Sequence, residues 1–153
     1  MNVASKIIIH CADTPNGRPT TVEDIDQWHG ERTPPFVRSE IARSACNPHL
    51  AHCGYHYVIY TDGSIHQGRA EDEIGAHCQG ENQISIGVCM IGKDQFTPEQ
   101  WTTLGLFVSA KGLPAFGHYE FPSAKAQGKT CPNFDVPAWV SAGYEPLGED
   151  VLV

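Results

Sequence analysis

Two histidines and one cysteine in this 153-residue chain could together bind a metal ion, although they lie far apart in the sequence: His10, His118 and Cys131. Imidazole nitrogen and thiolate sulfur are ligands that zinc prefers, and three protein ligands leave the fourth tetrahedral position open, as in catalytic zinc sites. His10 ends an apolar run, and a histidine in that position is often only a hydrogen-bonded structural residue. The sequence alone therefore leaves both interpretations of His10 open.

A denser group of potential ligands lies in the middle of the chain: Cys46, His49, His52, Cys53 and His56. Neither a helix nor a strand can turn all five of these side chains toward one point. The alternative interpretation is a polar surface loop with two buried thiols. One bound metal ion per chain would indicate the first group of ligands, and two would indicate both groups.

The composition indicates one folded domain and limits its partners. The chain is 41% hydrophobic with a net charge of −8, and its ten Lys and Arg residues do not cluster. A protein that binds nucleic acid or anionic lipid needs a basic face. We therefore expect no nucleic-acid partner and no stable membrane association. We also expect a monomer. We expect a single domain over residues 1–153, with a core over 5–143 and an acidic tail over 145–153.

Targeting signals are not evident in the sequence. No stretch reaches the ~20 apolar residues of a membrane span, and the first ten residues lack the apolar segment of a secretory signal. The six cysteines contain no CxxC pair, so a disulfide scaffold is not expected. These features predict synthesis in the cytoplasm.

Hydrophobic patterning predicts the elements that position these residues. We expect strands over 6–10, 55–60, 64–67 and 84–91, with a turn over 61–64. Helices are expected over 21–31, from Thr97 to Gly112, and over 135–142, with capping-box pairs at the start of the first two. Residues 33–53 allow no assignment. The pattern predicts an α/β domain in which helices flank a mixed central sheet, with a metal site at one edge of the sheet.

Several short motifs follow one another along most of the chain. They are IIIHC at 7–11, GYHYVI at 54–59 with DG at 62–63, GAH at 75–77, SIGV at 85–88, GH at 117–118, and KTCP at 129–132 with Asp135. Each motif is unspecific, but the ordered set resembles the type 2 N-acetylmuramoyl-L-alanine amidases. This zinc family includes the phage-type lysozyme amidases and the peptidoglycan recognition proteins.

The resemblance implies roles for particular residues. The ligands of one Zn²⁺ ion per chain would be His10, His118 and Cys131. Tyr55 and Lys129 match residues near the metal that activity requires in phage-type members, and His77 falls in a segment that lines the substrate groove. The alternatives are a core-packed Tyr55, a solvated loop charge at Lys129 and a structural hydrogen-bonding role for His77.

The implied activity is zinc-dependent hydrolysis of the amide bond between N-acetylmuramic acid and L-alanine in peptidoglycan. A phage or prophage endolysin would be made in the host cytoplasm and would reach the cell wall after the membrane is permeabilised. One alternative is a cytosolic amidase that recycles soluble muropeptides. Another is a non-catalytic peptidoglycan-binding protein, although such proteins typically lack the metal cysteine that Cys131 matches.

Overall fold

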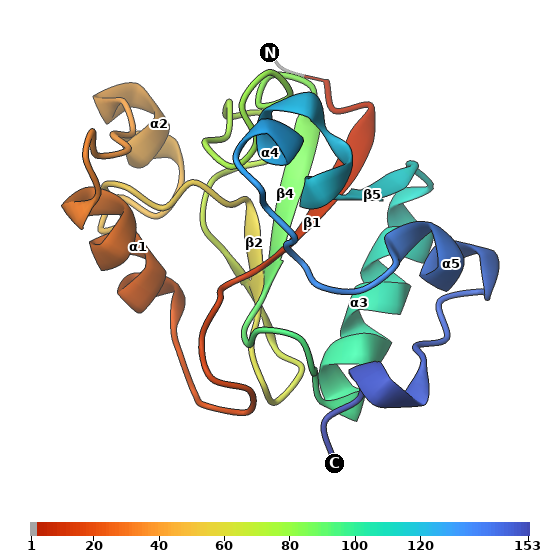
Figure 1. Ribbon diagram of the computed structural model, residues 1–153. Helices are drawn as coiled ribbons and strands as arrows, with labels where there is room; N and C mark the ends of the chain where they lie inside the picture. Colours follow the sequence, from red (N-terminus) through yellow and green to blue (C-terminus); the bar gives the residue numbers. More distant parts are fainter. Residues whose placement is uncertain (1–2) are drawn as a thin grey trace.

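The computed structural model describes residues 3–153; Met1 and Asn2, which begin the segment examined for a secretory signal, lie outside the described residues. Five strands form one mixed sheet in the order β3-β2-β4-β1-β5 (Figure 1). The strands are β1 (Lys6–Cys11), β2 (Tyr57–Ile59), β3 (Ile65–Gln67), β4 (Ser85–Met90) and β5 (Ala115–Gly117). Helices pack around this sheet, which confirms the expected α/β fold class. The helices are α1 (Val22–Glu31), α2 (Glu40–Ala45), α3 (Pro98–Lys111), α4 (Pro122–Ala126) and α5 (Val136–Ser141), with 3-10 turns η1 (His118–Glu120) and η2 (Gly148–Asp150).

The two central strands, β1 and β4, are apolar almost throughout because both faces of the sheet are covered. Successive side chains of a strand point to opposite faces. Ile7 and Ile9 therefore join the core beneath α3 and α5, which includes Trp101. Ile8 and His10 point to the other face, where Ile8 packs against Phe121. This alternation carries His10 to the face of the sheet that the metal site requires.

The expected helix starts are confirmed by their caps. Thr21 and Asp24 form a capping box before α1, and Thr97 and Gln100 form another before α3. The C-cap of α3 is Gly112, whose φ of 66° is a left-handed conformation that glycine adopts without strain. No helix in residues 3–153 combines the length and apolarity that a bilayer span would need.

The chain departs from the predicted strands around the site. β2 begins at Tyr57 rather than at residue 55. The backbone at Tyr55 instead pairs with the irregular segment that follows β3, where the Arg69 N–H donates to the Tyr55 carbonyl at 3.0 Å. The short elements β5, α2 and α4 were not expected. Each contains too few residues for a hydrophobic period to show.

The acidic C-terminal segment packs back onto the domain. The Phe96 N–H donates to the Asp150 carbonyl at 3.0 Å, and the Leu152 N–H donates to the Phe96 carbonyl at 2.8 Å. Phe96 and Val151 form an isolated parallel bridge. The end of the chain is therefore tied to the loop that precedes α3.

The long segment between α1 and β2 is organised by one buried guanidinium. Arg38 Nη2 lies 2.8 Å from Glu73 Oε1, and the Arg38 side chain is fully buried. Its remaining N–H groups donate to the carbonyls of Cys46, Asn47 and Leu50 at 2.7–2.9 Å. This side chain thus holds both a carboxylate and several backbone carbonyls of a segment that has little regular structure.

We predict that Arg38→Met lowers the free energy of unfolding by about 3 kcal/mol, because it removes one partner of a buried ion pair and leaves carbonyls without donors. Urea denaturation followed by circular dichroism would measure the change. Arg43→Met is the matched control, since the Arg43 guanidinium donates to the exposed Pro48 carbonyl and its loss should cost under about 1 kcal/mol. Equal stabilities of the two variants would contradict the role given to Arg38.

Candidate metal centre and active site

The sheet register brings the two candidate histidine ligands together. β1 and β5 are parallel neighbours with Ile9 opposite Gly117. The next residue along the chain is a histidine in each case: His10 on β1 and His118 at the start of η1, both at the carboxyl edge of the sheet. The centroids of their rings lie 4.5 Å apart. With Cys131, they form a group whose potential ligand atoms all lie within 4.8 Å of one another.

Backbone hydrogen bonds hold Cys131 against the end of β1. The Cys11 N–H donates to Cys131 Sγ at 3.0 Å, and the Tyr119 N–H donates to the Cys131 carbonyl at 3.0 Å. A backbone donor directed at sulfur favours the thiolate over the thiol. The loop that carries Cys131 is thus fixed both to β1 and to the turn that carries His118.

Burial keeps the two imidazoles neutral. Desolvation lowers the pKa of His10 well below its usual value, and the nearby His77 and His118 add to this effect. Burial also lowers the pKa of His118, with a further contribution from Lys129. The neighbouring Cys11 thiol and burial raise the pKa of Cys131. A bound cation would stabilise the Cys131 thiolate in this position.

The donor set fits a zinc ion. Two imidazole nitrogens and one sulfur are the mixed ligands that zinc binds well. Within residues 3–153, no fourth His, Cys, Asp or Glu side chain joins the group. A zinc ion held there would keep one coordination position free of protein, as catalytic rather than structural zinc sites do.

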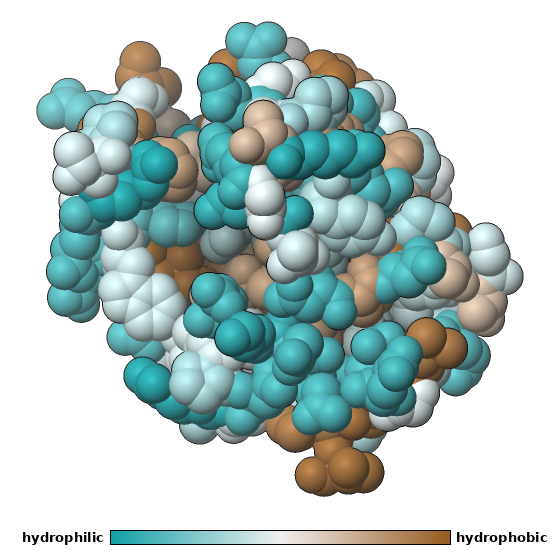
Figure 2. Space-filling view, viewed as in Figure 1, coloured by the Kyte–Doolittle hydropathy of each residue, from teal (hydrophilic) through white to brown (hydrophobic). Residues whose placement is uncertain are grey.

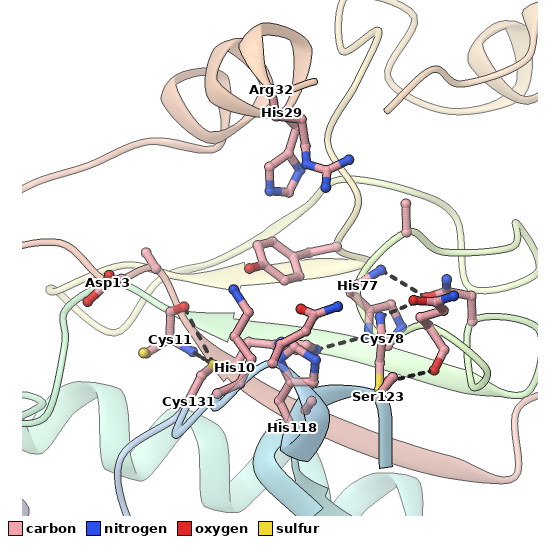
Figure 3. Close-up of a pocket in the computed structure, with 18 of the residues that line it drawn as sticks. His10, Cys11, Asp13, His29, Arg32, His77, Cys78, His118, Ser123 and Cys131 are labelled. Carbon is pink, nitrogen blue, oxygen red and sulfur yellow. Dashed lines mark hydrogen bonds between the residues drawn. The ribbon is translucent and has the colours of Figure 1, made fainter. Parts of the chain in front are cut away.

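This group lies in a groove of about 700 Å³. Figure 2 shows the surface hollowed between the α1 side and the α4 side, with hydrophilic side chains gathered along the rim. In Figure 3, His10, His118 and Cys131 converge at one side of the pocket, and His29 and Arg32 of the α1 segment face them across the opening. A ligand in the groove would therefore contact both walls and the candidate metal position.

Both residues that the resemblance assigns to activity line this groove. The Tyr55 ring centroid lies 5.1 Å from that of His10, and burial raises the Tyr55 pKa well above its usual value, so its hydroxyl stays protonated. Gly54 allows the close packing before Tyr55, because an added Cβ would lie 2.0 Å from the Ala76 carbonyl oxygen. Lys129 is exposed at the rim.

His77 also borders the groove, but its side chain is largely enclosed. The residue is 9% exposed, and its Nδ1 lies 2.9 Å from His10 Nε2. Burial lowers the pKa of His77 to about 3, with smaller contributions from His56 and His118. The structure thus places His77 behind a candidate ligand rather than at the open surface of the groove.

His29 is a residue of the groove that the sequence reasoning missed. The Gly54 N–H donates to His29 Nδ1 at 2.9 Å, so the neutral ring carries its proton on Nε2. Desolvation lowers the pKa of His29 to about 4, and the charges of Arg69 and Arg32 contribute further. His29 lies one helical turn after the buried Ile25, and this spacing was the available signal.

The dense group of cysteines and histidines does not assemble into a second metal site. His52 Nδ1 donates to the Phe36 carbonyl at 2.5 Å, and His56 Nε2 donates to the Glu73 carbonyl at 2.8 Å. His49 pairs with Glu23 at the surface. Each of these rings has its own partner, so the short spacing of these residues in the sequence does not reflect convergence.

Residues 1–134 match the model of a protein family described as N-acetylmuramoyl-L-alanine amidase. The endolysin of Escherichia phage T7 is 30% identical over 146 residues, covering 87% of this chain and 83% of that protein. The endolysin of Enterobacteria phage K11 is 29% identical over 152 residues, covering 91% of this chain and 87% of that protein.

Solved structures share the fold. The endolysin and N-acetylmuramoyl-L-alanine amidase LysCS from Clostridium intestinale has a TM-score of 0.65 at 22% identity, covering 91% of this chain and 82% of that one. A Drosophila PGRP-LB mutant in complex with tracheal cytotoxin has a TM-score of 0.64 at 20% identity, covering 93% of this chain and 82% of that one. At these sequence identities, the structural similarity shows a shared fold.

The lowered pKa of His29, about 4, makes the stability of the protein depend on pH. In the unfolded chain, His29 gains a proton as the pH falls through ~6.5, whereas the folded protein leaves it neutral until about pH 4. The free energy of unfolding should therefore decrease between these values. We expect this contribution to be about 1–2 kcal/mol after allowance for partial solvent exposure.

His29→Asn tests this linkage, since an amide oxygen can still accept the Gly54 N–H but does not titrate. Urea unfolding at several pH values between 7 and 4.5 should show a shallower loss of stability in the variant. The metal ligands are the same in both proteins, so the difference between the two profiles isolates His29. Parallel profiles would show that folding does not lower the pKa of His29.

Proposed function

The chain belongs to the N-acetylmuramoyl-L-alanine amidase family, and from that premise we propose that it is a zinc-dependent peptidoglycan hydrolase. The bond cleaved is the amide between the lactyl group of N-acetylmuramic acid and L-alanine. The observation that carries the proposal is the convergence of His10, His118 and Cys131 in a groove, with ligand atoms within 4.8 Å. One zinc ion per chain is the proposed cofactor.

The proposed chemistry divides between the metal and the residues around it. When bound, zinc supplies Lewis acidity toward the amide carbonyl and makes water a usable nucleophile near neutral pH. Tyr55 contributes a protonated hydroxyl that can donate a hydrogen bond to the reacting group. Lys129 contributes a positive charge at the rim, where it can stabilise the negative charge that develops on the carbonyl oxygen.

The groove suits a substrate that is part sugar and part peptide. Its walls combine aromatic and polar side chains from both sides, including Phe36, Arg32 and Asn82. The Arg32 guanidinium lies 4.1 Å from the Phe36 ring centroid, so this wall presents a cation supported by an aromatic face. The His29 Nε2–H adds a donor for a carbonyl or hydroxyl of the substrate.

A phage or prophage endolysin is the biological role that we favour. Four relatives that match 87–91% of this chain are phage endolysins. We propose that the protein is made in the host cytoplasm, acts as a monomer, and reaches the wall after the membrane is permeabilised. The recycling of soluble muropeptides is the second candidate, and turnover on intact sacculi compared with soluble fragments would separate the two roles.

The central experiment combines metal analysis with hydrolysis of purified sacculi. We expect one zinc ion per chain, release of peptide stems with free L-alanine amino groups, loss of activity with a chelator and recovery with zinc. Sacculus binding without hydrolysis in the zinc-loaded protein would instead indicate a peptidoglycan-binding protein.

Cys131→Ser should weaken zinc binding strongly and abolish hydrolysis, because a serine hydroxyl does not ionise to replace the thiolate. Zinc content after dialysis and dye release from labelled sacculi would measure both effects. Cys46→Ser is the matched control, since Cys46 lies outside the groove and near the Gly68 carbonyl. Retention of zinc and activity in Cys131→Ser would remove Cys131 from the ligand set.

Tyr55→Phe and Lys129→Ala should each retain zinc and lose turnover by roughly 100- to 1,000-fold, which is typical for loss of a donor that stabilises developing charge. Lys125→Ala is the control, because this lysine of α4 is exposed and does not line the groove. Steady-state hydrolysis and zinc content would be measured on the same preparations. Near wild-type turnover in either variant would assign that residue to packing or to solvation.

A further inference from the structure

We propose that His77 and Ser85 are positioning residues that fix the proton of His10 on Nε2 and so leave Nδ1 free to face the metal. This inference rests on the proposed zinc function and deepens it, since it names how one ligand acquires its orientation and tautomer. It follows from a line of three hydrogen bonds whose direction is set at one end by a backbone carbonyl.

The line begins at the Glu81 carbonyl, which can only accept a hydrogen bond. The Ser85 hydroxyl lies 2.6 Å from this oxygen and must donate to it. A serine hydroxyl has a single proton. Ser85 Oγ therefore has only lone pairs to offer to its second neighbour, His77 Nε2, at 3.2 Å.

The remaining proton positions follow from this one. His77 Nε2 must carry the hydrogen that it donates to Ser85. The residue is 9% exposed and its ring has no carboxylate among its hydrogen-bond partners in residues 3–153, so the ring is neutral. The Nδ1 atom of His77 is then an acceptor. His10 Nε2 lies 2.9 Å from it and must be the donor. Of the two nitrogens of the His10 ring, Nδ1 is thus the one with a free lone pair. A histidine binds a metal through such an unprotonated nitrogen.

The surroundings of His77 prevent the ring from turning to another partner. A Cβ added at Gly75 or Gly87 would lie 2.6 Å from the His77 ring, so the ring lies in a slot that exists because both positions lack a side chain. The His77 backbone N–H donates to Asn82 Oδ1 at 2.9 Å. The His10 and His77 rings meet edge to face, at an interplanar angle of 88°.

This enclosure argues for a positioning role over a role in substrate contact. Figure 3 shows the broken line from His10 to His77 running away from the side where Cys131 lies. Ser85 belongs to the buried strand β4 and is 4% exposed. The hydrogen-bonded line therefore connects the candidate ligand to the interior of the sheet.

Nuclear magnetic resonance tests the proton positions directly. Long-range ¹H–¹⁵N correlation spectra of the ¹⁵N-labelled protein should show both His10 and His77 protonated at Nε2 near neutral pH, with or without added zinc. A His10 ring protonated at Nδ1, or a mixture of tautomers, would overturn the proposal. Because the measurement needs no hydrolysis, its failure is distinguishable from failure of the proposed zinc chemistry.

A pair of variants of equal shape tests whether the hydrogen bond matters to the metal. The oxygen of His77→Asn can accept the His10 N–H, whereas His77→Leu has no acceptor. Competition with a chromogenic chelator should show zinc affinity about 10- to 100-fold weaker in the leucine variant and close to wild type in the asparagine variant. Equal weakening in both would show that His77 serves only to fill space.

Ser85→Ala removes the group that sets the direction of the line while leaving the His77 ring in place. We expect the spectra of this variant to show a mixture of His10 tautomers, together with weaker zinc binding. Ser123→Ala is the control, since Ser123 donates to the Gln79 carbonyl and takes no part in the line. An unchanged His10 tautomer in Ser85→Ala would exclude Ser85 from this role.

Discussion

The parallel pairing of β1 with β5 is the constraint on which the candidate site depends. Ile9 lies opposite Gly117, and the chain continues from each into a histidine at the same edge. A shift of one residue in β1 would turn His10 to the opposite face, into the apolar layer beneath α3 and α5. The register of β1 against β4 and β5 therefore decides which face of the sheet receives His10.

The site is also constrained by what burial does to ionisable groups. His10 is 1% exposed, and a charged imidazole there would lose its hydration without a carboxylate partner among its hydrogen bonds. The neutral histidines add no positive charge to the site, and the pKa of the Cys131 thiol is raised. A cation that binds beside them would therefore be stabilised by the imidazole lone pairs and by the thiolate. The same burial that folds the sheet thus prepares the ligands chemically, since zinc binds neutral imidazole and displaces the proton of a thiol.

Sequence reasoning succeeded where a single segment contains its own determinants. The capping boxes at Thr21 and Thr97 place two helices because the side chain and backbone groups involved are three residues apart. It did not find β5 or α4, which are stabilised by neighbours far away in the sequence. The loop around Arg38 depends on carbonyls and a carboxylate that no local pattern reveals.

The same limit applied to the site itself. Residue types alone made His10, His118 and Cys131 candidates, and the resemblance to a family then implied that they are the ligands. These residues lie too far apart in the sequence to form a local metal-binding motif. The dense run from 46 to 56 does not converge, as the geometric argument against five inward-pointing side chains indicated, because ligand density does not show where side chains point. His29 and Ser85 were missed because their contributions depend on hydrogen bonds with the Gly54 N–H and the Glu81 carbonyl.

Backbone groups fix the proton positions of several histidines beside the groove, and this determines which ring atoms remain available for chemistry. The Gly87 N–H donates to His56 Nδ1, and His56 Nε2 donates to the Glu73 carbonyl, so both nitrogens of this ring are used. The Gly54 N–H leaves the Nε2–H of His29 available as a donor. The line from the Glu81 carbonyl leaves His10 with a free lone pair. The chemical character of the groove is therefore set partly by residues that never touch a substrate, through amides and carbonyls that the fold holds in place.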